Sequence, residues 1–91
     1  MNILPPEHPL ANTFAVGPNA KSETIRLAEE VIGFALGETV TVKLANPARG
    51  TGPRYHGRSG TVAVINPADL EVGVDLKGTV TWFRTHEVVS L

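Results

Sequence analysis

Apolar residues recur along this chain with two different periods, and the period changes near residue 34. Before that point they are three or four positions apart, the spacing that places side chains on one face of an α-helix. These positions are Ile25, Leu27, Ala28, Val31, Ile32 and Ala35. The pattern predicts one amphipathic helix over residues 20–33. We expect Asn19 or Ser22 to cap its N-terminus and Gly33 to end it, since glycine adopts the left-handed conformation without strain.

After residue 34, apolar and polar residues alternate, as they do in antiparallel strands that bury one face. The alternating segments lie at residues 39–44, 61–65, 70–76, 79–84 and 88–91. Asn66-Pro67-Ala68-Asp69 and Lys77-Gly78 have the composition of tight turns, so the middle three segments are expected to form a meander. Five short strands in so small a chain are typical of a closed or half-closed barrel. The predicted fold class is mainly β, a small α+β protein.

Residues 1–19 hold four prolines and show neither period. Proline removes a backbone donor and fixes φ, so this segment is predicted to be an extended, Pro-rich N-terminal arm. Its apolar residues are Ile3, Leu4, Leu10, Phe14 and Val16. Three states are open for it: a disordered end, a segment across its own domain, or a segment docked on another subunit. The expected organisation is thus an arm (1–19), a helix (20–33) and a barrel (34–91).

The charges are unevenly distributed along the chain. The formal net charge is −1, but residues 39–68 hold four basic and no acidic residues, so they carry +4 while the remainder carries −5. The four basic residues are Lys43, Arg49, Arg54 and Arg58. Three of them lie in or beside a long connection, residues 45–59, that is rich in glycine and proline. Loops of this length in compact domains are often functional, so we expect one basic, functional face.

The residues on either side of this loop carry a resemblance to a known family. Gly37-Glu38-Thr39-Val40-Thr41-Val42 precedes the loop, and Gly57-Arg58-Ser59-Gly60-Thr61-Val62 follows it. Together they resemble the first two strands of SH3-like barrels of the KOW type, and Trp82-Phe83 followed by Glu87-Val88 is similar to the closing strands of such barrels. The resemblance covers residues 36–90. It implies a five-stranded SH3-like barrel, a fold that serves ribosomal proteins, elongation factors, enzyme subunits and peptide binders alike.

Eight residues are candidates for contact with nucleic acid. They are Lys43, Arg49, Arg54, Tyr55, His56, Arg58, Trp82 and Arg84. A guanidinium matches phosphate oxygens with its planar fork, and an aromatic ring can stack on an unpaired base. Tyr55 has an alternative role, packing on the barrel. Trp82 and Phe83 must point to opposite sides of their strand, and the resemblance places Phe83 inside, which leaves Trp82 partly exposed.

No catalytic residue, metal site or cofactor is predicted. His8, His56 and His86 share no metal-ligand spacing, and Ser59 and Ser90 lack the context of a catalytic nucleophile. The chain has no cysteine, which fits a reducing compartment. Its first residues lack a charged leader, and prolines interrupt every apolar run before membrane-span length. We therefore expect a cytoplasmic protein without membrane contact.

Two hypotheses about function follow, and neither is enzymatic. In the first, the chain is a binding module for RNA, DNA or a ribonucleoprotein, which it contacts through the basic loop and adjacent strands. In the second, it is a protein-interaction or assembly subunit, as in a phage-like particle, that binds another protein or itself through residues 1–36. A third class, an accessory subunit of an enzyme, stays open because such barrels occur there.

Overall fold

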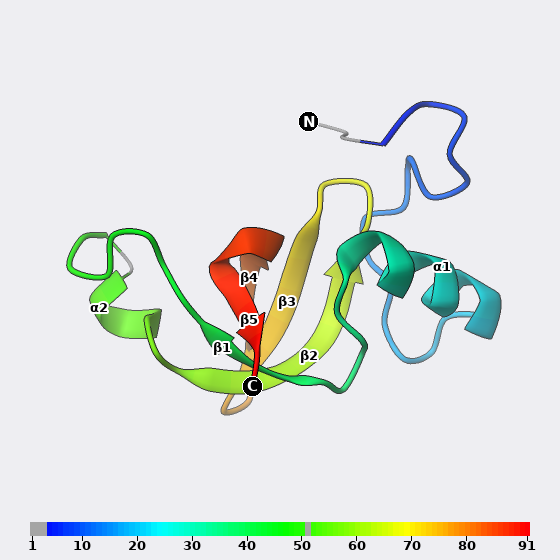
Figure 1. Cartoon of the computed structure of the whole chain (residues 1–91). Helices are drawn as coiled ribbons and strands as arrows, with labels where there is room; N and C mark the ends of the chain where they lie inside the picture. The colour runs from blue at the N-terminus through cyan, green and yellow to red at the C-terminus, as the bar shows by residue number, and fades with distance from the viewer. Residues whose placement is uncertain (1–3, 51) are drawn as a thin grey trace.

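The computed structural model describes residues 4–50 and 52–91 of the chain. They form one helix of 11 residues, a five-stranded sheet and two short helical turns (Figure 1). In chain order these are α1 (Ser22–Ile32), β1 (Thr39–Val42), α2 (Gly52–Tyr55), β2 (Ser59–Asn66), β3 (Glu71–Leu76), β4 (Thr79–Arg84), η1 (Thr85–Glu87) and β5 (Val88–Ser90). The predicted class, mainly β with one preceding helix, is confirmed.

The sheet is antiparallel throughout, with the strand order β4-β3-β2-β1-β5. The predicted meander is confirmed, because β2, β3 and β4 pair in succession. Lys77 and Gly78 join β3 to β4 with φ values of 56° and 93°, the left-handed pair that a tight two-residue hairpin requires. Gly78, at the second position of the turn, adopts its positive φ without strain.

The two ends of the sheet remain separate among the described residues. Pairing runs from β4 at one edge to β5 at the other. β1 pairs with the first residues of β2, at Ser59 and Thr61, whereas β3 pairs with the rest up to Asn66. A bulge between Val62 and Val64 bends the strand, and Figure 1 shows β2 curving strongly between its neighbours. The structure thus gives a curved open sheet.

The core lies on the concave side of this sheet and follows the predicted alternation. Val40 and Val42 of β1 are fully buried, as are the side chains of Val72 and Val74 in β3. α1 packs against β2 and adds Ala28 and Ile32 to the same cluster. Phe83 of β4 is 5% exposed and Trp82 is 43% exposed. The prediction that Phe83 points inward and Trp82 outward is confirmed.

The sequence predicted the C-terminal end of α1 correctly but not the capping of its N-terminal end. Gly33 has φ of 86° and donates its N–H to the carbonyl of Glu29 at 2.8 Å, so the predicted C-terminal glycine is confirmed. The predicted capping by Asn19 or Ser22 is wrong: Lys21 is the N-cap, and its side chain accepts no hydrogen bond from the first turn. The helix therefore begins without the stabilisation that an N-cap oxygen provides.

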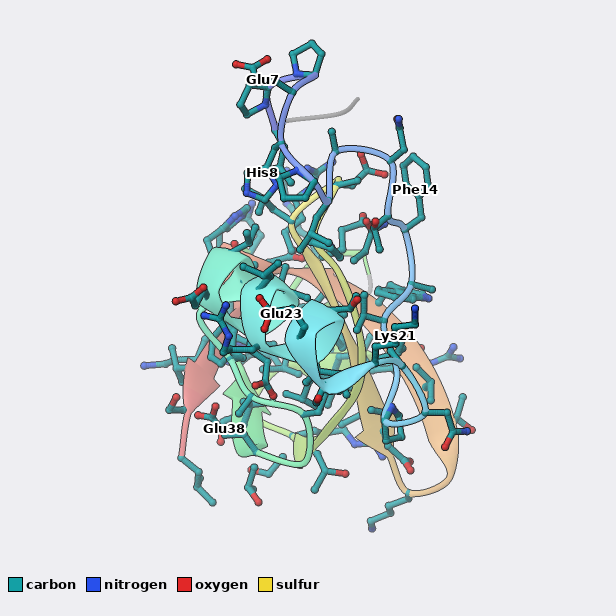
Figure 2. All side chains as sticks on the ribbon, turned by 90° about the vertical axis from the view of Figure 1, so that its right-hand side faces the viewer. Glu7, His8, Phe14, Lys21, Glu23 and Glu38 are labelled. Carbon is teal, nitrogen blue, oxygen red and sulfur yellow. The ribbon has the colours of Figure 1, made fainter. Side chains whose placement is uncertain are left out.

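The described part of the N-terminal arm lies against the chain's own sheet. Val16 and Ile65 of β2 each donate a backbone N–H to the carbonyl of the other, with N···O distances of 2.8 and 3.0 Å. Ala68 donates its N–H to the carbonyl of Thr13 at 3.1 Å. Leu10 is buried like Val16, whereas Phe14 on the arm points outward (Figure 2). Most apolar groups of the arm thus contribute to the core, and Ile3 lies outside the described residues.

No helix among residues 4–50 and 52–91 has the length and apolar character needed to cross a membrane.

Candidate functional site

The connection between β1 and β2 is closed at its base by backbone hydrogen bonds. The N–H of Val42 donates to the carbonyl of Arg58 at 2.9 Å, and Gly57 donates to the carbonyl of Val42 at 2.8 Å. The N–H of Leu44 donates to Nδ1 of His56 at 3.0 Å. Because Nδ1 accepts, a neutral ring carries its proton on Nε2, which is free to donate to a ligand. The base therefore brings Lys43, His56 and Arg58 together.

The described part of this loop is folded on itself. Arg49 donates its N–H to the carbonyl of Asn46 at 3.1 Å, and Gly52 donates to that of Arg49 at 2.8 Å. Gly52 is buried against the preceding turn, and a β-carbon there would lie 2.4 Å from the carbonyl oxygen of Pro47. Only glycine permits this approach. The loop thus presents α2 on a compact support, and Thr51 lies outside the described residues.

Tyr55 at the end of α2 attaches the loop to β4. Its ring meets the ring of Phe83 edge to face, with centroids 5.6 Å apart and planes at 84°, a favourable geometry for an aromatic pair. Tyr55 is half-buried, so it has the packing contact that was one of its two expected roles. The Arg54 guanidinium carbon lies over the same ring, 5.9 Å from its centroid.

A second contact joins the loop to η1. The N–H of Lys43 donates to the carbonyl of Glu87 at 2.7 Å. Arg49 and Glu87 border a surface hollow of about 340 Å³, which is also lined by Leu44, Ala45, Asn46, Gly50 and Gly52. The Glu87 carboxylate accepts the N–H of Arg84 at 2.8 Å, which keeps Arg84 beside the same turn. One acidic group therefore lies among the basic residues.

Six of the eight candidate residues are thus gathered at one end of the molecule. They are Lys43, Arg49, Arg54, Tyr55, His56 and Arg58. Trp82 and Arg84 are separate, because Phe83, which lies between them in β4, points toward Tyr55 and adjacent side chains of a strand point to opposite faces. Trp82 lies opposite Gly73 of β3, on the outer face of the sheet. Glu87 was missed by the sequence reasoning, because it lies outside the charge window and joins the site only through a long-range contact.

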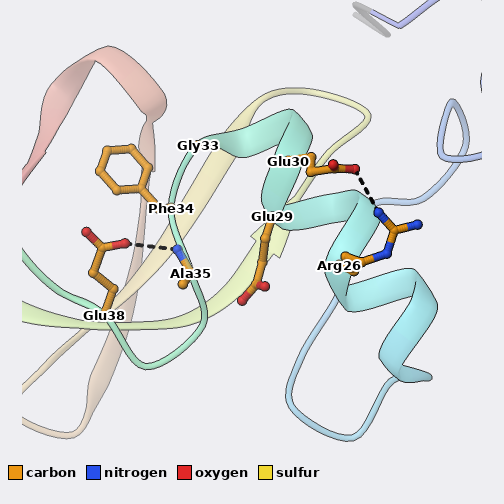
Figure 3. A pocket seen from close by; sticks show the side chains of 7 residues that line it. All are labelled: Arg26, Glu29, Glu30, Gly33, Phe34, Ala35 and Glu38. Carbon is orange, nitrogen blue, oxygen red and sulfur yellow. Dashed lines mark hydrogen bonds and ion pairs between the residues drawn. The ribbon is translucent and has the colours of Figure 1, made fainter.

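The end of α1 carries the opposite charge. A hollow of about 460 Å³ there is bordered by Arg26, Glu29, Glu30, Gly33, Phe34, Ala35 and Glu38 (Figure 3). Figure 1 shows α1 and α2 at opposite ends of the folded molecule, whose longest dimension is 39 Å. The structure therefore separates an acidic end from a basic one.

The carboxylates of the acidic end hold the connection from α1 to β1. Glu29 accepts the N–H of Leu36 at 2.7 Å, and Glu38 accepts that of Ala35 at 3.0 Å. The Ser90 hydroxyl also donates to Glu38. The hydrogen bond from Ser90, and then that from Ala35, lower the pKa of Glu38 below its ordinary value. Glu29 and Glu38 therefore have a structural role, because their carboxylates bind backbone groups of this connection.

Arg26 on the outer face of α1 is occupied by two carboxylates. Its guanidinium lies 2.7 Å from Glu23 and 3.4 Å from Glu30. Hydrogen bonding and charge attraction within the first pair lower the pKa of Glu23 and raise that of Arg26. The arginine of the acidic end is therefore already neutralised, and it is poorly placed to attract a further anion.

No three histidine, aspartate or glutamate side chains within the described ranges converge as metal ligands would. Comparison of the chain with protein-family models, curated proteins and solved structures finds no match.

Proposed function

We propose that the chain is a non-enzymatic binding module for nucleic acid, RNA or DNA, and that it binds through a cationic end. We define the cationic end as Lys43, Arg49, Arg54, His56 and Arg58. The observation that carries the proposal is their convergence from the β1–β2 loop and the adjoining strand end, at the opposite end from the carboxylates of α1. A phosphate backbone is attracted to the first surface and repelled by the second.

The residues of this end suit phosphate contact in complementary ways. Arg49 and Arg54 are exposed on the loop, where a guanidinium can present two parallel donors to one phosphate. Lys43 is exposed beside them and adds a point charge. His56 can donate from Nε2. Trp82, on the other face of β4, is assigned no role in this interface.

The same proposal extends to the finer fold. A half-closed SH3-like barrel of the KOW type is supported by the pairing of the first strand with the last, β1 with β5. It is further supported by the contact of Tyr55 with Phe83, which draws the β1–β2 loop over β4. In such a barrel the loop between the first two strands stands at one rim, which is where the cationic end lies.

The four lysine and arginine side chains set an upper limit on the salt dependence of binding. Each phosphate neutralised contributes about −0.7 to the slope of log K against log salt concentration for a single strand, and about −0.9 for B-form DNA. If every one of these cations met a phosphate, the slope would be about −2.8 to −3.6. Binding is expected to be measurable at low salt and weak at physiological salt.

The test is a binding titration of labelled single-stranded and duplex RNA and DNA, from about 50 to about 200 mM salt. Removing Lys43 and Arg49 together by alanine substitution should flatten the slope by about 0.7–0.9 for each phosphate that these side chains neutralise in the wild-type complex. Arg26→Ala removes one positive charge from the opposite end of the molecule and should leave the slope unchanged. Absence of binding at low salt, or binding indifferent to salt, would refute the proposal.

A second candidate function is protein contact through residues 1–36. It is favoured by the exposure of Phe14, 51% accessible on the arm, and by Phe34 beside the acidic hollow. The burial of Leu10 and Val16 weakens it, because these apolar groups of the arm need no partner to cover them. Sedimentation equilibrium of the pure protein and of Phe14→Ser separates the cases: a monomer in both opposes self-association, and an oligomer that dissociates in the variant supports it.

A further inference from the structure

We propose that Arg54, supported by the Tyr55 ring, is a stacking platform for one unpaired base, so that the ligand of the cationic end is a single strand. The inference rests on the proposed function, since it specifies which form of nucleic acid that surface prefers. It assigns base contact to an arginine, whereas the sequence suggested the tyrosine itself.

The Tyr55 ring that supports the guanidinium is fixed by the core. Phe83, 5% exposed, meets the Tyr55 ring at 5.6 Å between centroids. The Arg54 guanidinium lies over that ring at 5.9 Å. Both residues belong to α2, whose first residue, Gly52, is packed against the carbonyl of Pro47. The ring beneath the guanidinium is therefore anchored, and the guanidinium lies within the range of about 6 Å for a cation–π contact with it.

The guanidinium remains available to a ligand on its other side. Arg54 is exposed, and no ion pair involves it among the described residues. The contrast with Arg26, which two carboxylates engage, is direct. Tyr55 offers less room, because Phe83 and Arg54 already contact its ring. Among the exposed guanidinium groups of the described loop, that of Arg54 is the one that lies over an aromatic ring.

A planar cation of this kind favours single strands for a simple reason. Bases of a duplex are stacked on their neighbours and expose only their edges in the grooves. An unpaired base exposes its face, and guanidinium planes of arginine are among the groups on which such bases stack. Arg49 and Arg58 flank Arg54 along the loop and can hold the phosphates on either side of the stacked base.

The test compares four labelled probes at one fixed low salt concentration: a single-stranded RNA, a single-stranded DNA, a duplex of the same sequence, and an abasic single strand. The wild-type protein should bind the two base-bearing single strands more tightly than the duplex or the abasic strand. In Arg54→Lys, which keeps the charge and removes the plane, affinity for the base-bearing strands should fall by about 5- to 100-fold. Affinity for the abasic strand should not change.

Arg49→Lys is the matched control, because it makes the same exchange in the same loop away from the tyrosine ring. It should retain the preference for base-bearing strands. Circular dichroism and thermal unfolding of both variants establish that they fold. As a direct readout, the Arg54 Nε–H resonance of the wild-type protein should shift upfield on adding a base-bearing strand and remain in place with the abasic one.

The outcomes separate this inference from the function on which it rests. If neither single strands nor duplex bind with salt dependence, both proposals are wrong. If binding is salt-dependent but the abasic and base-bearing strands bind equally, or Arg54→Lys behaves like Arg49→Lys, the stacking platform is refuted and phosphate binding stands. A preference for duplex would refute the platform as well.

Discussion

Gly60 of β2 occupies a place where the sheet has no room for a side chain. A β-carbon there would lie 2.3 Å from the carbonyl oxygen of Asp75, and 2.9 Å from both Leu76 Cδ2 and Val74 Cγ1. The leucine methyl can move, but the Asp75 oxygen belongs to the backbone of β3, which is paired with β2 at the next residue, Thr61. Gly60→Ala can therefore be accommodated only if the two strands shift apart.

The magnitude follows from two opposing terms. Overpacking of this kind costs about 1–3 kcal/mol, and a contact with fixed backbone belongs near the upper value. Replacing glycine within a strand by alanine recovers about 0.5–1 kcal/mol of chain entropy. The net loss of unfolding free energy is about 2 kcal/mol, which lowers the melting temperature of a domain this size by about 8–16 °C.

Gly17→Ala is the matched control for this experiment. No heavy atom lies within 4 Å of a β-carbon built at Gly17, so the same chemical change should leave stability unchanged or raise it by up to about 1 kcal/mol. Both variants are compared with the wild type by urea and thermal unfolding. Equal stability of Gly60→Ala and Gly17→Ala would refute the interpretation that strand contact, rather than loop geometry, requires glycine at position 60.

Three further changes test other parts of the structure. The pKa of Glu38 is lowered, so its carboxylate contributes stability above its ordinary pKa of 4.5 and this stability is lost as the pH falls through the lowered pKa. Glu38→Gln and Ser90→Ala should therefore be less stable than the wild type at neutral pH and approach its stability in acid. Unfolding at several pH values measures this. Lys77→Asn should stabilise the β3–β4 hairpin by about 0.5 kcal/mol, because asparagine tolerates the left-handed conformation before Gly78 better than lysine does. An unchanged midpoint of urea unfolding would contradict this. Lys21→Asp should raise the free energy of unfolding by about 1 kcal/mol, because it supplies the missing N-cap oxygen. Lys21→Ala supplies no such oxygen and should not raise it. Equal urea midpoints for the two variants would show that capping is not the cause.

The features that could be predicted from the sequence are those that neighbouring residues determine. Alternation of valines decides which face of β1 and β3 is buried, because successive side chains of a strand point to opposite sides. Gly33 ends α1 because glycine reaches φ of 86° without strain. The Lys77-Gly78 turn is equally local. In each case the determining residues lie within a few positions of the feature.

The features that could not be predicted depend on contacts between distant segments. Tyr55 and Phe83 are far apart in the chain, and their ring contact places the loop over β4. The bridge of Val16 with Ile65 docks an arm whose composition allowed three different states. The position of Glu87 among the arginines likewise follows from how η1 returns to β1. Composition identified most of the candidate residues, but only the fold decides that Trp82 and Arg84 lie apart from them.

The separation of charge limits how the proposed ligand can lie. The chain measures 39 Å in its longest dimension and 25 and 19 Å in the others, and a nucleic acid that followed the long dimension would reach the carboxylates of α1. The contact is therefore confined to one end, which suits a site near the lower limit of about four nucleotides known for small single-strand-binding folds. Few phosphates within so short a site mean weak binding by one copy. Tight association would require several such ends acting on one strand, either from neighbouring domains or from several copies, because linked weak contacts gain affinity through effective concentration. Lengthening a single-stranded probe beyond one site should consequently raise the apparent affinity only when more than one copy can bind it.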